Sequence, residues 1–254
     1  MRQRCGCGSR CREKGMEREL SYDLHIHSCL SPCGDDDMTP GIVGMAAIKG
    51  LDVIAVTDHN SCRNCPAVLK LAEQYGVLAI PGMELTTAEE VHAVCLFSEL
   101  SAAMEFDRFV YGKLMKFPNR EEIFGKQQIM NEEDICIGSE SNLLINSTEL
   151  SFDELWDIVT GQYGGVMIPA HIDKNANSLI SNLGFVPPES QFRTAELHDM
   201  AALEELKKSN PYLEQCRIIC DSDAHYLEHI HEPEWKMKVR EKSAAAVIAY
   251  LRGE

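Results

Sequence analysis

Two histidines at alternate positions, His25 and His27, lie in an apolar run that starts at Leu20. If this run is a strand, alternate side chains point to the same side, and the two imidazoles converge on one point. Such a pair suits a borderline-soft divalent metal. An HxH pair alone is a weak indication, because two ordinary polar histidines near the end of a strand would read the same way.

The same residue types recur along the chain, at or just past the ends of other strand-like runs. They are His59, Glu84, His171, Asp223 and His225, whereas His92 stands at the start of a run. In α/β barrels, functional side chains gather at the carboxyl ends of the strands. The sequence therefore predicts that these side chains share one metal site.

Apolar and turn patterns predict the elements that would position these residues. Strands are expected at 20–27, 53–56, 77–81, 92–97, 166–171, 195–197 and 217–220. Helices are expected at 39–50, 66–75, 151–163, 201–208 and 239–251, with Thr39 and Ser151 as N-caps. Strands alternating with helices indicate a parallel sheet with crossover helices, and the length and strand count suit a closed barrel.

Composition narrows the class of protein. The chain has 254 residues and a formal net charge of −16, which disfavours non-specific binding to polyanions. No apolar run approaches the length of a membrane span, so a soluble, cytoplasmic protein is expected. Eleven cysteines at irregular spacing argue against a disulfide framework and for a reducing compartment.

Three parts of the chain are distinguished by pattern. Residues 1–15 are rich in Cys and Arg without apolar periodicity, and a disordered tail is expected there. Residues 16–254 read as a single domain. Within it, residues 101–150 break the alternation of strand and helix, and we expect an inserted helix followed by a hairpin near 131–138.

Taken in order, the motifs resemble those of the PHP (polymerase and histidinol phosphatase) family of metal-dependent phosphoesterases. The motifs are Asp23-Leu24-His25-Ile26-His27-Ser28, Thr57-Asp58-His59-Asn60, Gly82-Met83-Glu84, His92, Pro169-Ala170-His171 and Ser222-Asp223-Ala224-His225. The resemblance covers about residues 22–226. It implies a distorted (β/α)7 TIM-like barrel that binds two to three divalent metal ions, with zinc, manganese and iron all open.

The resemblance also implies how the ligands divide among the metals. The first metal would take His25, His27, Glu84 and Asp223. The second would share Glu84 and add His92 and His171. The third would take His59 and His225 together with one residue from the loop after His27. Asp35 is the favoured candidate by counting back from the helix start, and Cys33 by counting forward from His27; if neither binds, the site is binuclear.

Several neighbouring residues have open roles. Asp58 would hold loop geometry or orient a histidine, with direct ligation as the alternative. Lys174 and Arg63 follow metal-bearing motifs and could contact a substrate phosphate, or be ordinary rim charges. Cys62 and Cys65 form a CxxC that, with Cys29 and Cys33, could be a redox-sensitive rim or simply small loop residues.

The resulting expectation is hydrolysis of a small phosphomonoester by a metal-bound hydroxide, with Glu84, Asp223, His171 and Asp58 at the reaction centre. Candidate substrates are nucleotides, nucleoside bisphosphates and esters like histidinol phosphate. A short oligonucleotide is allowed as a substrate, whereas a long nucleic acid and a membrane are not expected as partners. The alternatives are a metal-binding regulatory or scaffold module without turnover, and a redox sensor built on the four cysteines.

Overall fold

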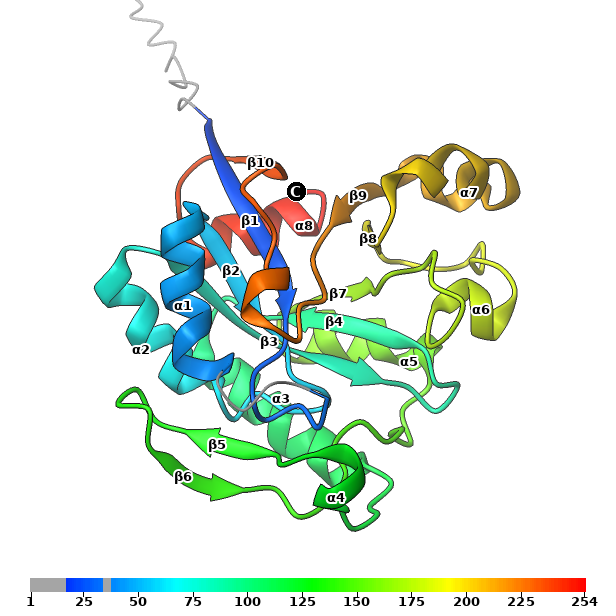
Figure 1. Cartoon of the computed structure of the whole chain (residues 1–254). Helices are drawn as coiled ribbons and strands as arrows, with labels where there is room; N and C mark the ends of the chain where they lie inside the picture. Colours follow the sequence, from blue (N-terminus) through cyan, green and yellow to red (C-terminus); the bar gives the residue numbers. More distant parts are fainter. Residues whose placement is uncertain (1–16, 34–37) are drawn as a thin grey trace, which may run out of the picture.

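The computed structural model describes residues 17–33 and 38–254. The predicted tail at 1–15 and the candidate ligand Asp35 therefore lie outside the described residues. Figure 1 shows a curled sheet flanked by helices, with a two-stranded hairpin beneath it.

The largest sheet has six strands in the order β10-β1-β2-β3-β4-β7. The bounds are β1 Arg18–Ile26, β2 Val53–Val56, β3 Leu78–Thr86, β4 His92–Leu96, β7 Val166–Pro169 and β10 Lys236–Val239. The pairs β1–β2 and β2–β3 are parallel, whereas β4 is antiparallel to both of its neighbours and β10 is antiparallel to β1. The carboxyl ends of β1, β2 and β3 consequently lie at one edge.

A second sheet continues the curl beyond β7. It contains β8 (Thr194–Leu197) parallel to β9 (Arg217–Cys220). The residues after β9 return to the end of β1, where Ile26 and Ala224 form a parallel bridge. The α/β class is therefore confirmed, with a curled half-barrel sheet, whereas an exact (β/α)7 TIM barrel is not confirmed, because the hydrogen-bonded ladder of the described residues is divided between separate sheets.

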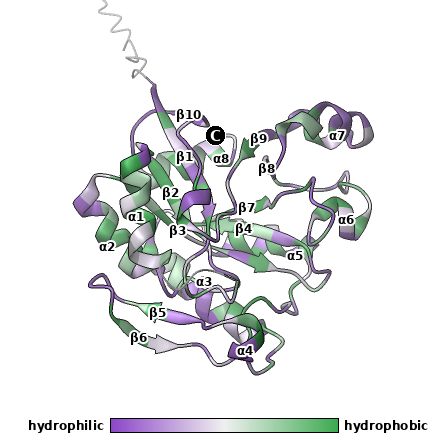
Figure 2. Ribbon diagram, viewed as in Figure 1, coloured by the Kyte–Doolittle hydropathy of each residue, from purple (hydrophilic) through white to green (hydrophobic). Residues whose placement is uncertain are grey.

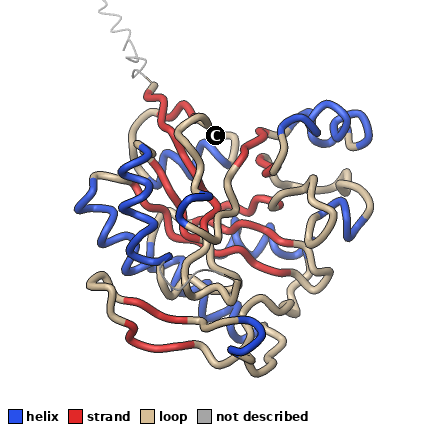
Figure 3. The backbone as a smooth tube through the Cα atoms, in the orientation of Figure 1, coloured by secondary structure: helices blue, strands red, loops and turns tan. Residues whose placement is uncertain are grey.

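Helices cover the sheet on both sides (Figures 1 and 3). Their bounds are α1 Met38–Lys49, α2 Cys65–Tyr75, α3 Leu100–Lys113, α4 Glu121–Phe124, α5 Phe152–Trp156, α6 Leu179–Leu183, α7 Leu203–Ser209 and α8 Ala244–Leu251. A π-helical turn, Asp157–Gln162, continues α5, and the Ser151 side chain accepts a hydrogen bond from the Glu154 amide, which confirms the predicted cap. Thr39, in contrast, lies inside α1, which begins at Met38.

Alternation along β2 divides the core between the two faces of the sheet. Val53 and Ala55 pack with α8 on one face, and Ile54 and Val56 pack with α1 and α2 on the other. The sequence of a strand covered on both faces is a continuous apolar run, and for this reason the predicted bounds of β2 agree with the structure. Figure 2 shows the hydrophobic colour concentrated in the strands and the hydrophilic colour strongest on outer elements such as α7.

The insertion at 101–150 contains α3, α4 and a hairpin of β5 (Gln128–Met130) and β6 (Cys136–Ser139), close to the prediction. The predicted C-terminal helix, 239–251, begins too early, because Val239 is the last residue of β10, which pairs with β1, and α8 begins at Ala244. Along β10 exposed lysines alternate with buried apolar residues, which is typical of an antiparallel strand with one buried face. Among the described residues, no helix is long and apolar enough to cross a membrane.

Close approach of two strands explains the glycine in Gly82-Met83-Glu84. A Cβ at Gly82 would lie 2.6 Å from the carbonyl oxygen of Cys95 and 2.6 Å from a methyl group of Leu96. The antiparallel partner β4 therefore leaves no room for a side chain beside Glu84.

We expect Gly82→Ala to lower the free energy of unfolding by about 1–3 kcal/mol, because β3 and β4 must separate to admit the methyl group. The matched control is Gly112→Ala in α3, where a Cβ meets nothing within 4 Å; it should raise stability by about 0.5–1 kcal/mol. Urea denaturation of both variants measures the two effects. Equal stabilities for Gly82→Ala and the wild type would contradict the packing argument.

Candidate metal centre

The end of β1 brings the two histidines of the HxH motif together. Their Nε2 atoms lie 3.2 Å apart, and both side chains are fully buried. The β1–β2 register shifts between Asp23 and Ile26, at the point where these histidines leave the regular ladder. The predicted convergence of His25 and His27 is therefore present.

Glu84, near the end of β3, lies at the centre of the histidines. Its carboxylate is 1% exposed and has ring nitrogens of five histidines within 3.4 Å. These are His25 at 3.3 Å, His27 at 3.4 Å, His59 at 3.0 Å, His92 at 2.7 Å and His171 at 3.0 Å. His92 stands at the start of its strand instead of the end. It nevertheless reaches Glu84, because β4 runs antiparallel to β3.

Asp223 completes a set of donors with His25, His27 and Glu84. Its Oδ1 lies 3.1 Å from His27 Nε2 and 3.5 Å from His25 Nε2. Four ligands at about 2.1 Å around a tetrahedral ion lie roughly 3.4 Å from one another. His25 and His27 lie 3.2 Å from each other and 3.1–3.5 Å from carboxylate oxygens of Glu84 and Asp223, with His25 nearest Oε1 of Glu84 and His27 nearest Oε2. These separations fit that spacing, so the four residues could hold a metal ion.

Two further groups can be drawn from the same cluster. One consists of His59, Glu84 and His92, and the other of His27, His59 and His225. His59 therefore lies between the predicted positions of the second and third metals, since it belongs to both groups. His171 borders the position of the second metal, because its Nε2 lies 3.0 Å from Oε1 of Glu84. Three buried polar atoms here make no well-aligned hydrogen bond. Nδ1 of His59 and Oε2 of Glu84 lie 3.0 Å from each other, and Nδ1 of His171 has no hydrogen-bond partner.

Unpartnered buried polar atoms are rare and indicate a missing ion or water. The chemistry of the donor set, imidazoles with carboxylates, also suits zinc, manganese and iron. The residues therefore fit the divalent metals that the motifs imply.

The protonation states suit metal ligands. Burial raises the pKa of a carboxyl group, but His92, His25 and His59 hold the pKa of Glu84 well below its usual range. His25 and His27 likewise outweigh burial and lower the pKa of Asp223. Burial lowers the pKa values of His27 and His59, which keeps their rings neutral. At neutral pH Glu84 and Asp223 are thus charged, and His27 and His59 offer free imidazole nitrogens. His25 is the exception, because its pKa is raised.

Glu196 is a functional residue that the sequence reasoning missed. It lies on β8, is 1% exposed, and its carboxylate lies 2.9 Å from His25 Nδ1, so it orients the ring that presents Nε2 to the site. Burial lowers the pKa of His25, but Glu196 and Glu84 together raise it well above its ordinary value. The available signal was a carboxylate inside the apolar strand Thr194–Leu197.

Asp58 has a positioning role through the loop after β1. Its carboxylate accepts hydrogen bonds from the Ser28 amide at 2.7 Å and from the hydroxyls of Ser28 and Ser31 at 2.6 and 2.7 Å. The Ser31 hydroxyl lies 2.9 Å from His27 Nδ1. These contacts place Asp58 where it can orient His27 by way of Ser31.

The two predicted phosphate contacts differ in position. Lys174 lines the cavity above the cluster, and its Nζ lies 2.5 Å from Oδ2 of Asp223. Arg63 does not line that cavity: its guanidinium lies 2.5 Å from Glu140 and over the ring of Tyr111. A phosphate contact by Arg63 is therefore not supported by its position, because its charge is paired with Glu140 of the insertion.

Of the two interpretations of the cysteines, small loop residues fit Cys29, Cys62 and Cys65 better than a redox-sensitive rim. Cys62 and Cys65 are buried, and both thiols donate to the Gly82 carbonyl oxygen, at 3.2 and 3.4 Å. Burial raises the pKa of Cys62, which disfavours the reactive thiolate. Cys29 is also buried. Cys33, in contrast, is exposed, lines the cavity, and has its Sγ 3.4 Å from His59 Nε2.

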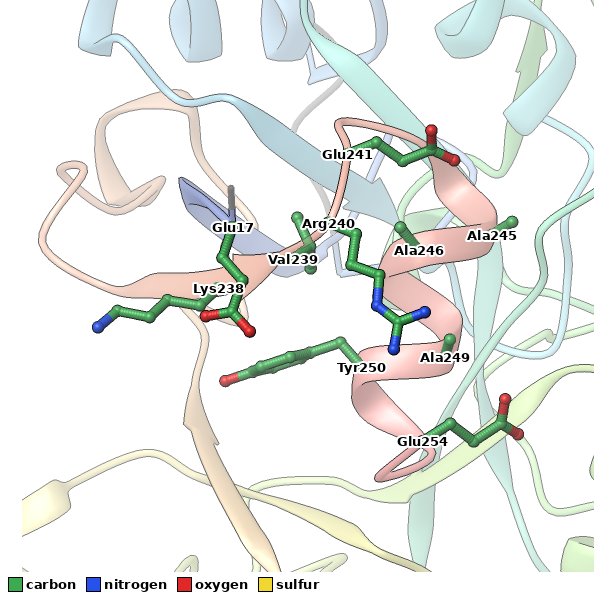
Figure 4. Close-up of a pocket in the computed structure, with 10 residues that line it drawn as sticks. All are labelled: Glu17, Lys238, Val239, Arg240, Glu241, Ala245, Ala246, Ala249, Tyr250 and Glu254. Carbon is green, nitrogen blue, oxygen red and sulfur yellow. The ribbon is translucent and has the colours of Figure 1, made fainter. Parts of the chain in front are cut away.

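Two cavities are relevant to the location of the site. The one above the cluster has a volume of about 490 Å³ and is lined by six of the histidine and carboxylate residues named above. A larger one, of about 590 Å³, lies between β10, the start of β1 and α8 (Figure 4). Figure 4 shows Arg240 and Tyr250 in it, with glutamates around them but no histidine. It borders the amino end of β1, roughly 25 Å along the strand from the metal ligands.

Family comparison agrees with this geometry. The model of the PHP domain matches residues 23–228, most of the chain and all the candidate ligands described. The chain belongs to the PHP family. An uncharacterised protein of Methanocaldococcus jannaschii is 37% identical over 79 residues, which covers 28% of this chain and 46% of that protein. The matched part thus spans about half the length of that relative.

Solved structures share the fold of this PHP chain. The lesion-specific endonuclease PfuEndoQ from Pyrococcus furiosus has a TM-score of 0.64 at 19% identity, covering 93% of this chain and 56% of that one. A two-domain protein from Bacteroides vulgatus, described as containing a predicted PHP-like metal-dependent phosphoesterase, has a TM-score of 0.55 at 17% identity, with coverages of 96% and 67%. At these identities the likeness concerns the fold.

We expect Glu196→Gln to weaken binding of the first metal by about 10–100-fold, because an amide holds the His25 ring less firmly than a carboxylate. The matched control is Glu204→Gln on the exposed part of α7, which should bind metal like the wild type. Competition titration with a chromophoric chelator measures both affinities. Wild-type affinity in Glu196→Gln would mean that Glu196 does not position His25.

Proposed function

We propose that this PHP protein is a metal-dependent phosphoesterase that hydrolyses a small phosphomonoester, on a barrel of the (β/α)7 type. The observation that supports this most is the donor set at the end of β1, in which His25 and His27 lie 3.1–3.5 Å from each other and from carboxylate oxygens of Glu84 and Asp223. Family membership supplies the reaction class. The intact set of ligand types argues against the alternative of a scaffold module without turnover.

The proposed ligands are divided among two to three metals. The first takes His25, His27, Glu84 and Asp223; the second takes Glu84, His92 and His171; the third takes His59 and His225 with Cys33 or Asp35. Bound divalent metals would supply Lewis acidity toward water and phosphate and would neutralise phosphoryl charge. Cys33 gains support from its 3.4 Å distance to His59.

The chain's own residues prepare this site. Glu196 and Asp58 fix the orientation of the first two histidines from behind, through His25 Nδ1 and through Ser31. Lys174 holds Oδ2 of Asp223 while Oδ1 faces the histidines, and its ammonium group also borders the cavity. It is thus placed to offer a charge-assisted hydrogen bond to a phosphoryl oxygen.

Substrate size is argued from the cavity and the charge. A volume of about 490 Å³ lies within the usual range for small-molecule sites. A net charge of −16 disfavours contact with a long phosphate backbone. One observation favours a nucleic-acid substrate instead. Endonuclease Q, which is similar in fold at a TM-score of 0.65, has been solved with a 27-mer duplex substrate carrying an abasic lesion. Cleavage of a nucleic-acid strand is therefore the second candidate.

Metal-restored turnover tests the proposed function. Protein dialysed against chelator should not hydrolyse an aryl phosphate, and added manganese or zinc should restore hydrolysis at two to three metals per chain. A 27-mer duplex with an abasic site, incubated in parallel, tests the second candidate. Absence of turnover with every metal, together with metal-induced thermal stabilisation, would instead indicate the scaffold module.

Glu84→Gln should reduce kcat/KM for the aryl phosphate about 10³-fold or more, since Glu84 contacts five histidines and is shared between two proposed metals. His225→Ala should cause a smaller loss, because His225 belongs to one group only. Metal content by elemental analysis accompanies each kinetic measurement. Equal losses in the two variants would contradict the assignment of Glu84 as the shared ligand.

A further inference from the structure

Asn60 connects the candidate metal centre to the insertion. It directly follows His59, and its side-chain amide donates to the carbonyl oxygens of Leu144 at 2.7 Å and Asn146 at 2.8 Å. Its Oδ1 accepts from the Thr86 amide at 2.9 Å. Asn60 is 1% exposed and has a φ of 49°, a left-handed conformation that asparagine tolerates. This one buried amide therefore holds the insertion loop on both sides of Ile145.

The loop is also fixed from the side of the insertion. Leu144 is fully buried against Leu30 and Leu114, and its amide donates to Gln127 Oε1 at 2.8 Å. Asn146 Nδ2 donates to the Met115 carbonyl oxygen at 2.5 Å. With both neighbours fixed, Ile145 has a defined position, and it lines the cavity above the metal cluster.

Ile145 differs in chemistry from the rest of the cavity wall. The described residues that line the cavity are Cys33, His59, Glu84, His92, Ile145, His171, Lys174, Asn175, Ala176, Asn177, Asp223 and His225. Among them, Ile145 is the large aliphatic side chain, and the others are polar, small or candidate ligands. A phosphoryl group at the ligands would place its ester substituent in the same cavity that Ile145 lines.

We propose that Ile145, held in place by Asn60, is a specificity-determining residue that packs against the leaving group of the ester. The site then prefers esters whose leaving group presents an aromatic ring over esters with a small or polar leaving group. The inference rests on the proposed phosphoesterase function and adds a substrate class to it. An aromatic ring offers a flat apolar face to the isoleucine and gains free energy from the buried area.

The test compares two non-hydrolysable probes, phenylphosphonate and methylphosphonate, by calorimetric titration of the metal-loaded protein. The wild type should bind the phenyl probe more tightly, and Ile145→Ala should reduce the ratio of the two affinities about five- to tenfold. The matched control is Ile137→Ala, which removes an exposed isoleucine of the same insertion that does not line the cavity. It should keep the wild-type ratio. An unchanged ratio in Ile145→Ala overturns the proposal.

Asn60→Gly tests the positioning role of the amide, since glycine retains the left-handed backbone without the side chain. It should lower the ratio as Ile145→Ala does, and the double variant should show no further loss. Metal content equal to that of the wild type shows that His59 is undisturbed. A wild-type ratio in Asn60→Gly would remove Asn60 from the proposal.

Turnover of phenyl phosphate and glycerol phosphate separates this inference from the proposed function. If both esters are hydrolysed and Ile145→Ala leaves their kcat/KM ratio unchanged, the inference fails and the function stands. If neither ester is hydrolysed but the phosphonate ratio depends on Ile145, the function fails and the binding preference stands. If neither phosphonate binds to the metal-loaded protein, the inference is overturned.

Discussion

A buried carboxylate determines how the rest of this protein is arranged. Glu84 is 1% exposed, and an isolated charge at such a position would be strongly unfavourable without compensating groups. Compensation comes from five histidines that arrive from β1, from the loop after β2, from β4 and from the end of β7. The ends of β1, β2, β3 and β7 and the start of β4 must lie at the same height for these rings to meet, so the register of the sheet is itself a requirement of the site.

The backbone around Glu84 carries the strain that this convergence requires. His171 and Asp223, both candidate ligands, have positive φ angles of 32° and 51°. Non-glycine residues in this region cost about 1–3 kcal/mol each and persist where surrounding contacts fix them. The Asp223 segment is fixed by the pairing of Ala224 with β1, through its amide to His25 and its carbonyl oxygen to the His27 amide. Rigid strands thus stabilise turns that would otherwise relax.

Residue type and spacing predicted those features that depend on local pattern. The histidines, Glu84 and Asp223 follow apolar runs, and a parallel arrangement of the first strands is enough to collect them. Glu196 could not be found in this way, because its partner His25 is 171 residues away in sequence. The direction of β4 and the pairing of β10 with β1 were missed for the same reason, since both depend on long-range contacts. The two interpretations of Arg63, phosphate contact or rim charge, could not be separated from the sequence, because its partner Glu140 lies in the insertion.

If the proposed function holds, the insertion offers a source of selectivity among phosphate esters. The metals would attract any phosphate, so the ligands by themselves discriminate little between one ester and another. Discrimination needs a wall that contacts the part of the substrate that does not react. Here that wall includes Ile145. The side-chain amide of Asn60, the residue next to His59, binds the carbonyl oxygens on both sides of Ile145. A change in the insertion would therefore alter this wall without moving the strands that carry the ligands.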